Sequence, residues 1–238
     1  MEQSNPQQLS LGVALADGAT FENFYTIEGS GAAQAVFALQ TFLQSPSEHG
    51  FFLWGSSGSG LSHLLQASCH KANQMRQSAQ YLPLADLVGF APEALLEGME
   101  RFDLLCFDGL QHVAGKADWE QALFNCFNRS KDRGRKIIFS ANANPSELPV
   151  KLPDLSSRLA WGLSFQVPLL GDQEKLEALT MRSKARGLQL PEEVAQFILN
   201  RAPRHIGELF EILDRLDRAS LSEQRKLTIP FAKQVLGM

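Results

Sequence analysis

The stretch FFLWGSSGSGLSHLL, residues 51–65, constrains the fold more than any other part of the chain. A short apolar run, typical of a buried strand, is followed by Gly55, Gly58 and Gly60 and then by helical spacing. A glycine-rich turn between a strand and a helix points several backbone N–H groups at one place, and the helix N-terminus adds positive partial charge. The stretch therefore predicts an anion-binding loop; the alternative is an ordinary glycine-serine turn.

The loop departs from the usual phosphate-binding pattern, G-x-x-x-x-G-K-[ST], because Leu61 stands where a lysine is usual. Ser62 occupies the position of the hydroxyl that binds Mg²⁺ in such loops. A missing charge near the β- and γ-oxygens weakens triphosphate binding more than diphosphate binding. The predicted phosphate-binding residues are Ser57, Gly58, Ser59, Gly60, Leu61 and Ser62.

Short apolar runs and helical stretches alternate up to about residue 168, and only helical spacing follows. Alternation of this kind predicts a parallel sheet with helices on both faces. We expect strands at 51–54, 79–84, 103–108, 136–140 and 163–167, and helices at 29–45, 61–76 and 119–134. The predicted fold class is α/β, a phosphate-loop core followed by a small all-helical lid domain. The predicted boundaries are a tail at 1–18, a nucleotide-binding domain at 19–168 and the lid domain at 169–238.

Two further strand ends carry polar residues. LLCFDG (104–109) ends an apolar run in Asp108, a position suited to holding Mg²⁺ together with Ser62. The next residue is Gly109, where a competent ATPase of this kind usually has a water-activating glutamate. Asn142 follows another strand and would lie beside the γ-phosphate position. A capping aspartate and a turn-forming asparagine are the plain structural alternatives.

The composition excludes some classes of protein. The formal net charge of −4 argues against a surface that binds nucleic acid everywhere, although residues 128–136 hold five basic residues against Asp132. Such a stretch is more often a solvated helix end. Three cysteines without a C-x-x-C pair, no leader sequence and no apolar run of membrane-spanning length favour a cytoplasmic protein.

Taken in order, these motifs resemble those of AAA+ ATPases. TFENFYTIEGSGAA (20–33) is similar to the segment before the glycine loop of the bacterial initiator DnaA, and SRLAWGL (157–163) is similar to its arginine-finger box. The sequence ends soon after the lid, which leaves no room for a DNA-reading helix-turn-helix domain. Together with residues 213–236, these features resemble the Hda family, DnaA-homologous regulatory inactivators of DnaA.

The resemblance implies a negative regulator of DNA replication initiation that is not a competent ATPase on its own. Arg158 would be an arginine finger offered in trans to ATP held by DnaA. Phe24 and Tyr25 would line the base pocket, and Asn142 would be the first sensor residue. Gly207 stands where the lid's sensor arginine belongs, with Arg204 one turn earlier. The implied ligand is ADP or another nucleoside diphosphate, with Mg²⁺ as a further expectation.

The N-terminal sequence QLSLGV resembles the short peptide by which bacterial proteins dock on the replicative sliding clamp. A glutamine fits a small polar pocket of such a partner, and the apolar side chains fill a neighbouring one. The predicted clamp-binding residues are Gln8, Leu9, Ser10, Leu11 and Val13. The expected partners are DnaA, the β sliding clamp, DNA through the clamp, and a second copy in a homodimer, at the replisome or nucleoid.

Two alternatives from other classes remain open at this stage. One is a self-sufficient phosphate-loop ATPase or nucleotide kinase, against which Leu61 and Gly109 argue. The other is a DnaA-like, DNA-associated adaptor that ignores nucleotide.

Overall fold

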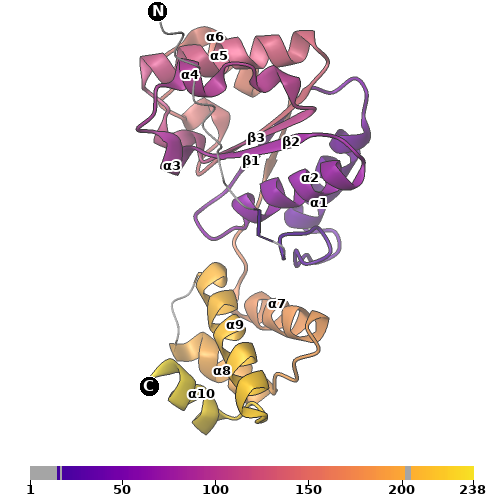
Figure 1. Cartoon of the computed structure of the whole chain (residues 1–238), viewed down its shortest axis with the longest axis vertical. Helices are drawn as coiled ribbons and strands as arrows, with labels where there is room; N and C mark the ends of the chain where they lie inside the picture. Colours follow the sequence, from indigo (N-terminus) through magenta and orange to yellow (C-terminus); the bar gives the residue numbers. More distant parts are fainter. Residues whose placement is uncertain (1–14, 17, 202–204) are drawn as a thin grey trace, which may run out of the picture.

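The structure is a computed structural model, and it describes residues 15, 16, 18–201 and 205–238 of the 238-residue chain. Five strands form one parallel sheet in the order β2-β3-β4-β1-β5 (Figure 1). The strands are β1 Gly50–Trp54, β2 Ala79–Pro83, β3 Leu104–Asp108, β4 Lys136–Ala141 and β5 Leu163–Gln166. The expected strands and the parallel sheet are confirmed.

Helices cover both faces of this sheet. The longer ones are α1 Gly31–Gln44, α2 Leu61–Gln74, α5 Ala117–Asp132 and α6 Pro153–Ala160, and the short ones are α3 Leu84–Leu87 and α4 Pro92–Leu96. Three 3₁₀ turns lie between them, η1 Met99–Arg101, η2 Leu110–His112 and η3 Pro145–Glu147. The predicted fold class, an α/β core followed by a helical lid domain, is confirmed.

The sequence reading missed α6, the helix that carries Arg158. Its first turn begins with Pro153, whose fixed φ suits a helix start, and Leu155 and Leu159 are buried one turn apart. Eight residues are too few for hydrophobic spacing to stand out from the flanking loop and strand. The helix forms because these two leucines pack into the core beneath α5.

The C-terminal part is helical, as predicted, with α7 Asp172–Ala185, α8 Glu192–Arg201, α9 Ile206–Glu223 and α10 Ile229–Leu236. These helices enclose a core of their own, in which Leu179, Leu213 and Phe231 are fully buried. This core contains no residue of the sheet, so the helical part and the sheet each have an apolar core of their own. The exact domain boundaries proposed above stay a prediction.

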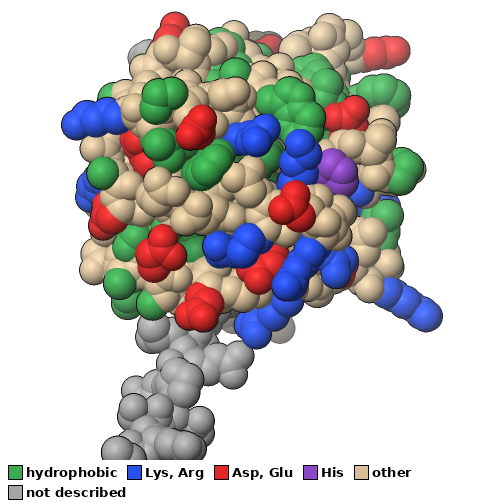
Figure 2. Space-filling model, turned by 90° about the horizontal axis from the view of Figure 1, so that it is seen from above, with side chains coloured by type: hydrophobic (Ala, Val, Ile, Leu, Met, Phe, Trp, Pro, Cys, Tyr) green, Lys and Arg blue, Asp and Glu red, His purple; other side chains and the backbone are tan. Residues whose placement is uncertain are grey.

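Helices α4, α5 and α6 lie at the end of the α/β part that is farthest from the helical domain (Figure 1). Figure 2 shows this end of the molecule, on which Lys and Arg side chains are interspersed with Asp and Glu side chains. Within the basic stretch 128–136, Arg129 and Arg133 both pair with Glu100, and Arg135 pairs with Asp103. These ion pairs neutralise much of the positive charge of this stretch with acidic residues of the same chain. They favour the solvated helix end over a DNA-binding surface.

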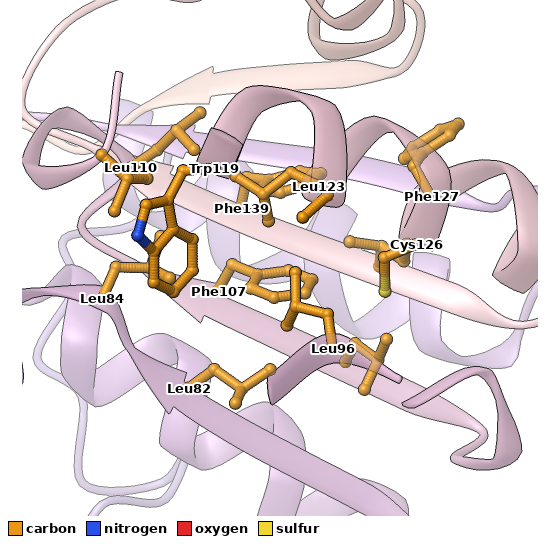
Figure 3. Packing of buried hydrophobic residues seen from close by; sticks show 14 of the residues in the cluster. Leu82, Leu84, Leu96, Phe107, Leu110, Trp119, Leu123, Cys126, Phe127 and Phe139 are labelled. Carbon is orange, nitrogen blue, oxygen red and sulfur yellow. The ribbon is translucent and has the colours of Figure 1, made fainter. Parts of the chain in front are cut away.

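The sheet separates two apolar clusters because neighbouring residues of a strand point to opposite faces. Phe52 faces α5, whereas Phe51 faces α1 and α2. Figure 3 shows the larger cluster, in which α5 lays one face against the sheet. Four residues at helical spacing on one face of α5, Trp119, Leu123, Cys126 and Phe127, are buried to 1% exposure or less. This packing fixes the strand ends from which the candidate site is built.

Candidate functional site

The glycine loop between β1 and α2 has a backbone that side chains would not tolerate. Gly58 and Gly60 have φ values of +87° and +93°, a region that L residues rarely adopt. A Cβ on Gly60 would lie 2.6 Å from the Phe24 ring, and one on Gly55 would lie 2.3 Å from the carbonyl oxygen of Val167. The loop is therefore a glycine-dependent turn that leads straight into the N-terminus of α2.

The Phe24 ring closes one side of the loop. It lies 5.5 Å from the His63 ring, and Nε2 of His63 lies 2.7 Å from the carbonyl oxygen of Thr20. Burial lowers the pKa of His63, so at neutral pH the uncharged imidazole donates to that carbonyl. His63 thereby fixes the segment that carries Phe24 and Tyr25, the two predicted base-pocket residues.

Asp108 lies at the end of β3 and both of its carboxylate oxygens accept hydrogen bonds. The hydroxyls of Tyr81 and Ser140 donate to Asp108 at 2.5 Å each. The N–H of Gly109 in turn donates to Ser140 Oγ at 2.9 Å. Burial, and the Asp108 carboxylate next to it, raise the pKa of Tyr81 well above its ordinary value, so its hydroxyl stays a donor. This network holds the carboxylate in one orientation at the edge of the pocket.

Asn142 follows β4 and is exposed beside the same pocket. Its backbone N–H donates to Oε1 of Gln111 at 3.1 Å, which ties the end of β4 to η2. The neighbouring Ala141 accepts from the N–H of Gly55 at 3.1 Å. The amide side chain of Asn142 is thus presented at the strand end by two backbone contacts.

The helical domain forms the opposite wall. Ile206, Gly207 and Phe210 on α9 and Ala178 on α7 line a pocket of about 630 Å³ together with the glycine loop, Phe24 and Tyr25. The hydroxyl of Tyr25 donates to Oε2 of Glu177 on α7 at 2.5 Å. This hydrogen bond raises the pKa of Tyr25 to about 12 and lowers that of Glu177. The predicted loop residues, Asp108 and Asn142 all line this one pocket.

Arg158 does not line the pocket of its own chain. It is half-buried on α6, which Figure 1 shows at the end of the α/β part away from the helical domain. Within the described part of the chain, its guanidinium makes no salt bridge and no side-chain hydrogen bond. Trp161 follows in the same turn with 50% of its surface exposed, and the Lys131 ammonium lies 3.8 Å from the centroid of its ring.

The residues present suit a bound phosphate group. A Cβ on Gly58 would meet the His205 ring, so the loop approaches the helical domain closely only because residue 58 is glycine, and the first N–H groups of α2 have no partner within the helix. The buried hydroxyl of Ser59 has no hydrogen-bond partner among the described residues. For Mg²⁺, Ser62 and Asp108 would supply two oxygen ligands, with phosphate oxygens and water completing the set.

Sequence reasoning missed four residues that organise the site. Ser140 could have been found, because a polar residue at the end of an apolar strand is a recognisable signal. Tyr81, Gln111 and Glu177 carry no such signal, since their roles depend on contacts with residues distant in the sequence. Arg204 and the predicted clamp-binding residues Gln8 to Val13 lie outside the described residues. Among the described helices, none is both long enough and apolar enough to cross a bilayer.

Comparison with known proteins agrees with this geometry. The family described as the bacterial DnaA ATPase domain matches residues 15–166, and the family described as the Hda lid domain matches residues 172–236. Domain III of the replication initiation protein DnaA from Thermotoga maritima is 24% identical, with a TM-score of 0.77 over 94% of this chain and 98% of that one.

Two other solved structures are similar in fold. AMPPCP-bound DnaA from Aquifex aeolicus is 24% identical, with a TM-score of 0.70 over 88% of this chain and 71% of that one. The Thermotoga maritima RuvB branch-migration motor is 14% identical, with a TM-score of 0.62 over 92% and 71%. The protein described here belongs to the DnaA-related AAA+ family, with a bacterial DnaA ATPase domain followed by a lid domain of the Hda type.

Proposed function

We propose that this protein is a negative regulator of replication initiation that activates ATP hydrolysis by DnaA through Arg158. In this proposal the protein holds ADP or another nucleoside diphosphate, docks on the sliding clamp through residues 8–13 and acts as a homodimer. It does not hydrolyse ATP efficiently itself. Family membership supports a role in replication initiation, and the finer statements rest on the site.

The observation that carries the proposal is the separation of Arg158 from the pocket of its own chain. An arginine that served its own nucleotide would reach into that pocket, whereas α6 presents Arg158 at the far end of the α/β part. An arginine supplied by a neighbouring subunit stabilises the charge that develops during phosphoryl transfer. The exposed Trp161 beside it offers an apolar contact for the subunit that would receive the finger.

The pocket supports a role in binding more than one in catalysis. Leu61 brings no charge to the phosphates, and Gly109, with φ +80°, brings no carboxylate to activate water. Both losses reduce phosphoryl transfer within this chain, yet they leave the backbone N–H groups of the loop in place. A retained diphosphate would then stabilise the contact between the two domains, because the pocket is lined by both.

The test is an assay of ATP hydrolysis by DnaA in the presence of clamp-loaded DNA. The wild-type protein should stimulate hydrolysis, and Arg158→Ala should reduce the stimulation at least about 100-fold, as expected for an arginine finger. Gln8→Ala should lose clamp binding and stimulation together. Arg218→Ala, an exposed arginine of α9, is the matched control and should behave as the wild type.

Full stimulation by Arg158→Ala would contradict the proposed mechanism. Robust ATP turnover by the purified protein alone would favour the self-sufficient ATPase instead. If Arg158→Ala loses stimulation but keeps clamp binding and the wild-type melting temperature, the loss belongs to the finger and not to unfolding.

A further inference from the structure

The pocket lacks the cations that usually hold a nucleotide's phosphates. Leu61 stands where the loop pattern has a lysine, and Gly207 stands where the resemblance to DnaA places the lid's sensor arginine. Among the described residues that line the pocket, the basic side chains are His63 and His112. His63 is already bound to the carbonyl of Thr20. Apart from His112 and the serine hydroxyls of the loop, backbone N–H groups are the donors left to face a ligand that carries two to three negative charges.

His205 brings an imidazole to the loop from the helical domain. It is the N-cap residue of α9, and its carbonyl accepts from the N–H of Leu209 at 3.2 Å, which fixes where the residue sits. A Cβ placed on Gly58 would lie 2.8 Å from Nδ1 of His205 and 3.7 Å from its Cε1. The nitrogen-bearing edge of the ring thus lies against Gly58 of the glycine loop, next to the residues that line the pocket and not among them.

We infer that His205 is the phosphate-binding cation of this site and that it takes up a proton from solvent when a diphosphate binds. The inference rests on the proposed binding of a nucleoside diphosphate and names the residue that replaces the missing lysine and arginine. An imidazole gains its proton between pH 5 and 8, so a bound phosphate beside it readily favours the charged form. The charged ring can then donate from Nδ1 to a phosphate oxygen.

The surrounding charges fit this assignment. His63, Asp108 and His112 line the same pocket from α2, β3 and η2, and Glu208 lies in the first turn of α9. From α7, Arg182 lies over the Phe210 ring, 4.4 Å from its centroid, and so is engaged elsewhere. His205 is the N-cap of α9 and lies against the loop that leads into α2, and the positive partial charge at the N-termini of these two helices favours a bound anion beside it.

Two consequences follow. Affinity for a diphosphate should rise as pH falls from 7.5 to 6.0, because binding takes up a proton, by up to about tenfold for each pH unit. The effect requires a phosphate at the loop, so adenosine, which has none, should bind with the same affinity at both pH values. The contact between the helical domain and the glycine loop would also depend on the bound ligand, since His205 belongs to the helical domain.

The experiment is calorimetric titration of the full chain with ADP, inorganic pyrophosphate and adenosine at pH 6.0 and 7.5. Two buffers with different ionisation enthalpies give the number of protons taken up. His205→Gln keeps a hydrogen-bond donor without the charge, and His205→Ala removes both. His49→Gln, directly before β1 and not among the residues that line the pocket, is the matched control, and Arg204→Ala tests the arginine next to His205 in the sequence.

We expect the wild type to take up about 0.5 to 1 proton more per pyrophosphate than His205→Gln, and to bind it about tenfold more tightly at pH 6.0. His49→Gln should match the wild type. Equal affinity and proton uptake in the wild type and His205→Gln would overturn the inference and leave the diphosphate site standing. So would loss of the pH dependence in Arg204→Ala but not in His205→Gln. Failure of the wild type to bind either ADP or pyrophosphate would overturn both proposals.

Discussion

Glu120 holds the segment that leads into the helix of Arg158, and replacing it tests how that arginine is positioned. Its side chain is 1% exposed on α5. Its carboxylate accepts from the N–H groups of Gly115 at 2.6 Å, Lys151 at 3.0 Å and Leu152 at 2.7 Å. Leu152 is the N-cap of α6. One buried carboxylate thus satisfies three backbone donors that would otherwise be unpaired.

We predict that Glu120→Gln lowers the free energy of unfolding of the α/β domain by about 2–4 kcal/mol. The amide keeps one oxygen but turns an NH₂ group toward a backbone donor, so one buried N–H loses its partner and the remaining bonds lose their charge. For a chain of this size the melting temperature should fall by about 5–15 °C. Stimulation of DnaA should fall as well, even at temperatures where the variant is folded, because α6 would lose its fixed start.

The assays are urea unfolding, followed by tryptophan fluorescence, and the DnaA hydrolysis assay at 20 °C. Gln121→Ala is the matched control: Gln121 is exposed on the same helix and its side chain donates to Asn125 on the next turn, so the stability of the variant should stay within about 0.5 kcal/mol of the wild type. The reasoning is refuted if Glu120→Gln unfolds at the wild-type urea concentration.

Three further predictions concern the pocket, the cores and a thiol. Leu61→Lys combined with Gly207→Arg should raise the affinity for AMPPCP about 10–100-fold in a binding titration. The structure has room for the new side chain, since a Cβ on Gly207 meets nothing within 4 Å. Leu61→Met combined with Gly207→Ala adds no charge and should leave the affinity for AMPPCP nearly unchanged. Phe231→Ala should lower the free energy of unfolding of the helical domain by about 3–5 kcal/mol and leave the unfolding of the sheet unchanged, as monitored by hydrogen exchange. If amide protons of β3 lose as much protection as those of the helical domain, the two cores are not separate. Burial raises the pKa of Cys126 to about 11, so its contribution to stability is full below about pH 8.5 and is lost as pH rises through about 11. All three buried cysteines should therefore react with a thiol reagent at pH 8 only as the chain unfolds, and a thiol that titrates rapidly in the native protein would disprove this.

Much of the fold could be predicted because its signals are local. The strand at 51–54, the glycine turn and the helix at 61–76 follow one another directly in the sequence, so spacing alone predicts all three elements. The buried face of α5 follows from helical periodicity in the same way. The helix α6 escaped this reasoning because it is short and its burial depends on contact with α5.

The residues of the candidate site likewise fall into those that the local sequence predicts and those that only tertiary contacts reveal. Gly58, Ser62 and Asp108 are recognisable in the sequence because each occupies a fixed place relative to a strand end. The partners of Asp108 could not be foreseen, since Tyr81 and Ser140 reach it only when β2, β3 and β4 become neighbours in the sheet.

By itself, the sequence determined that the chain forms a phosphate-loop α/β domain with a helical domain behind it, and that the loop's lysine is missing. Only the tertiary structure decided which side chain lies at that loop, because His205 is far from Gly58 in the sequence and meets it only through the fold of the helical domain. It also decided that Arg158 lies away from its own pocket. Local sequence preferences act over a few residues, whereas these two placements depend on how whole helices pack.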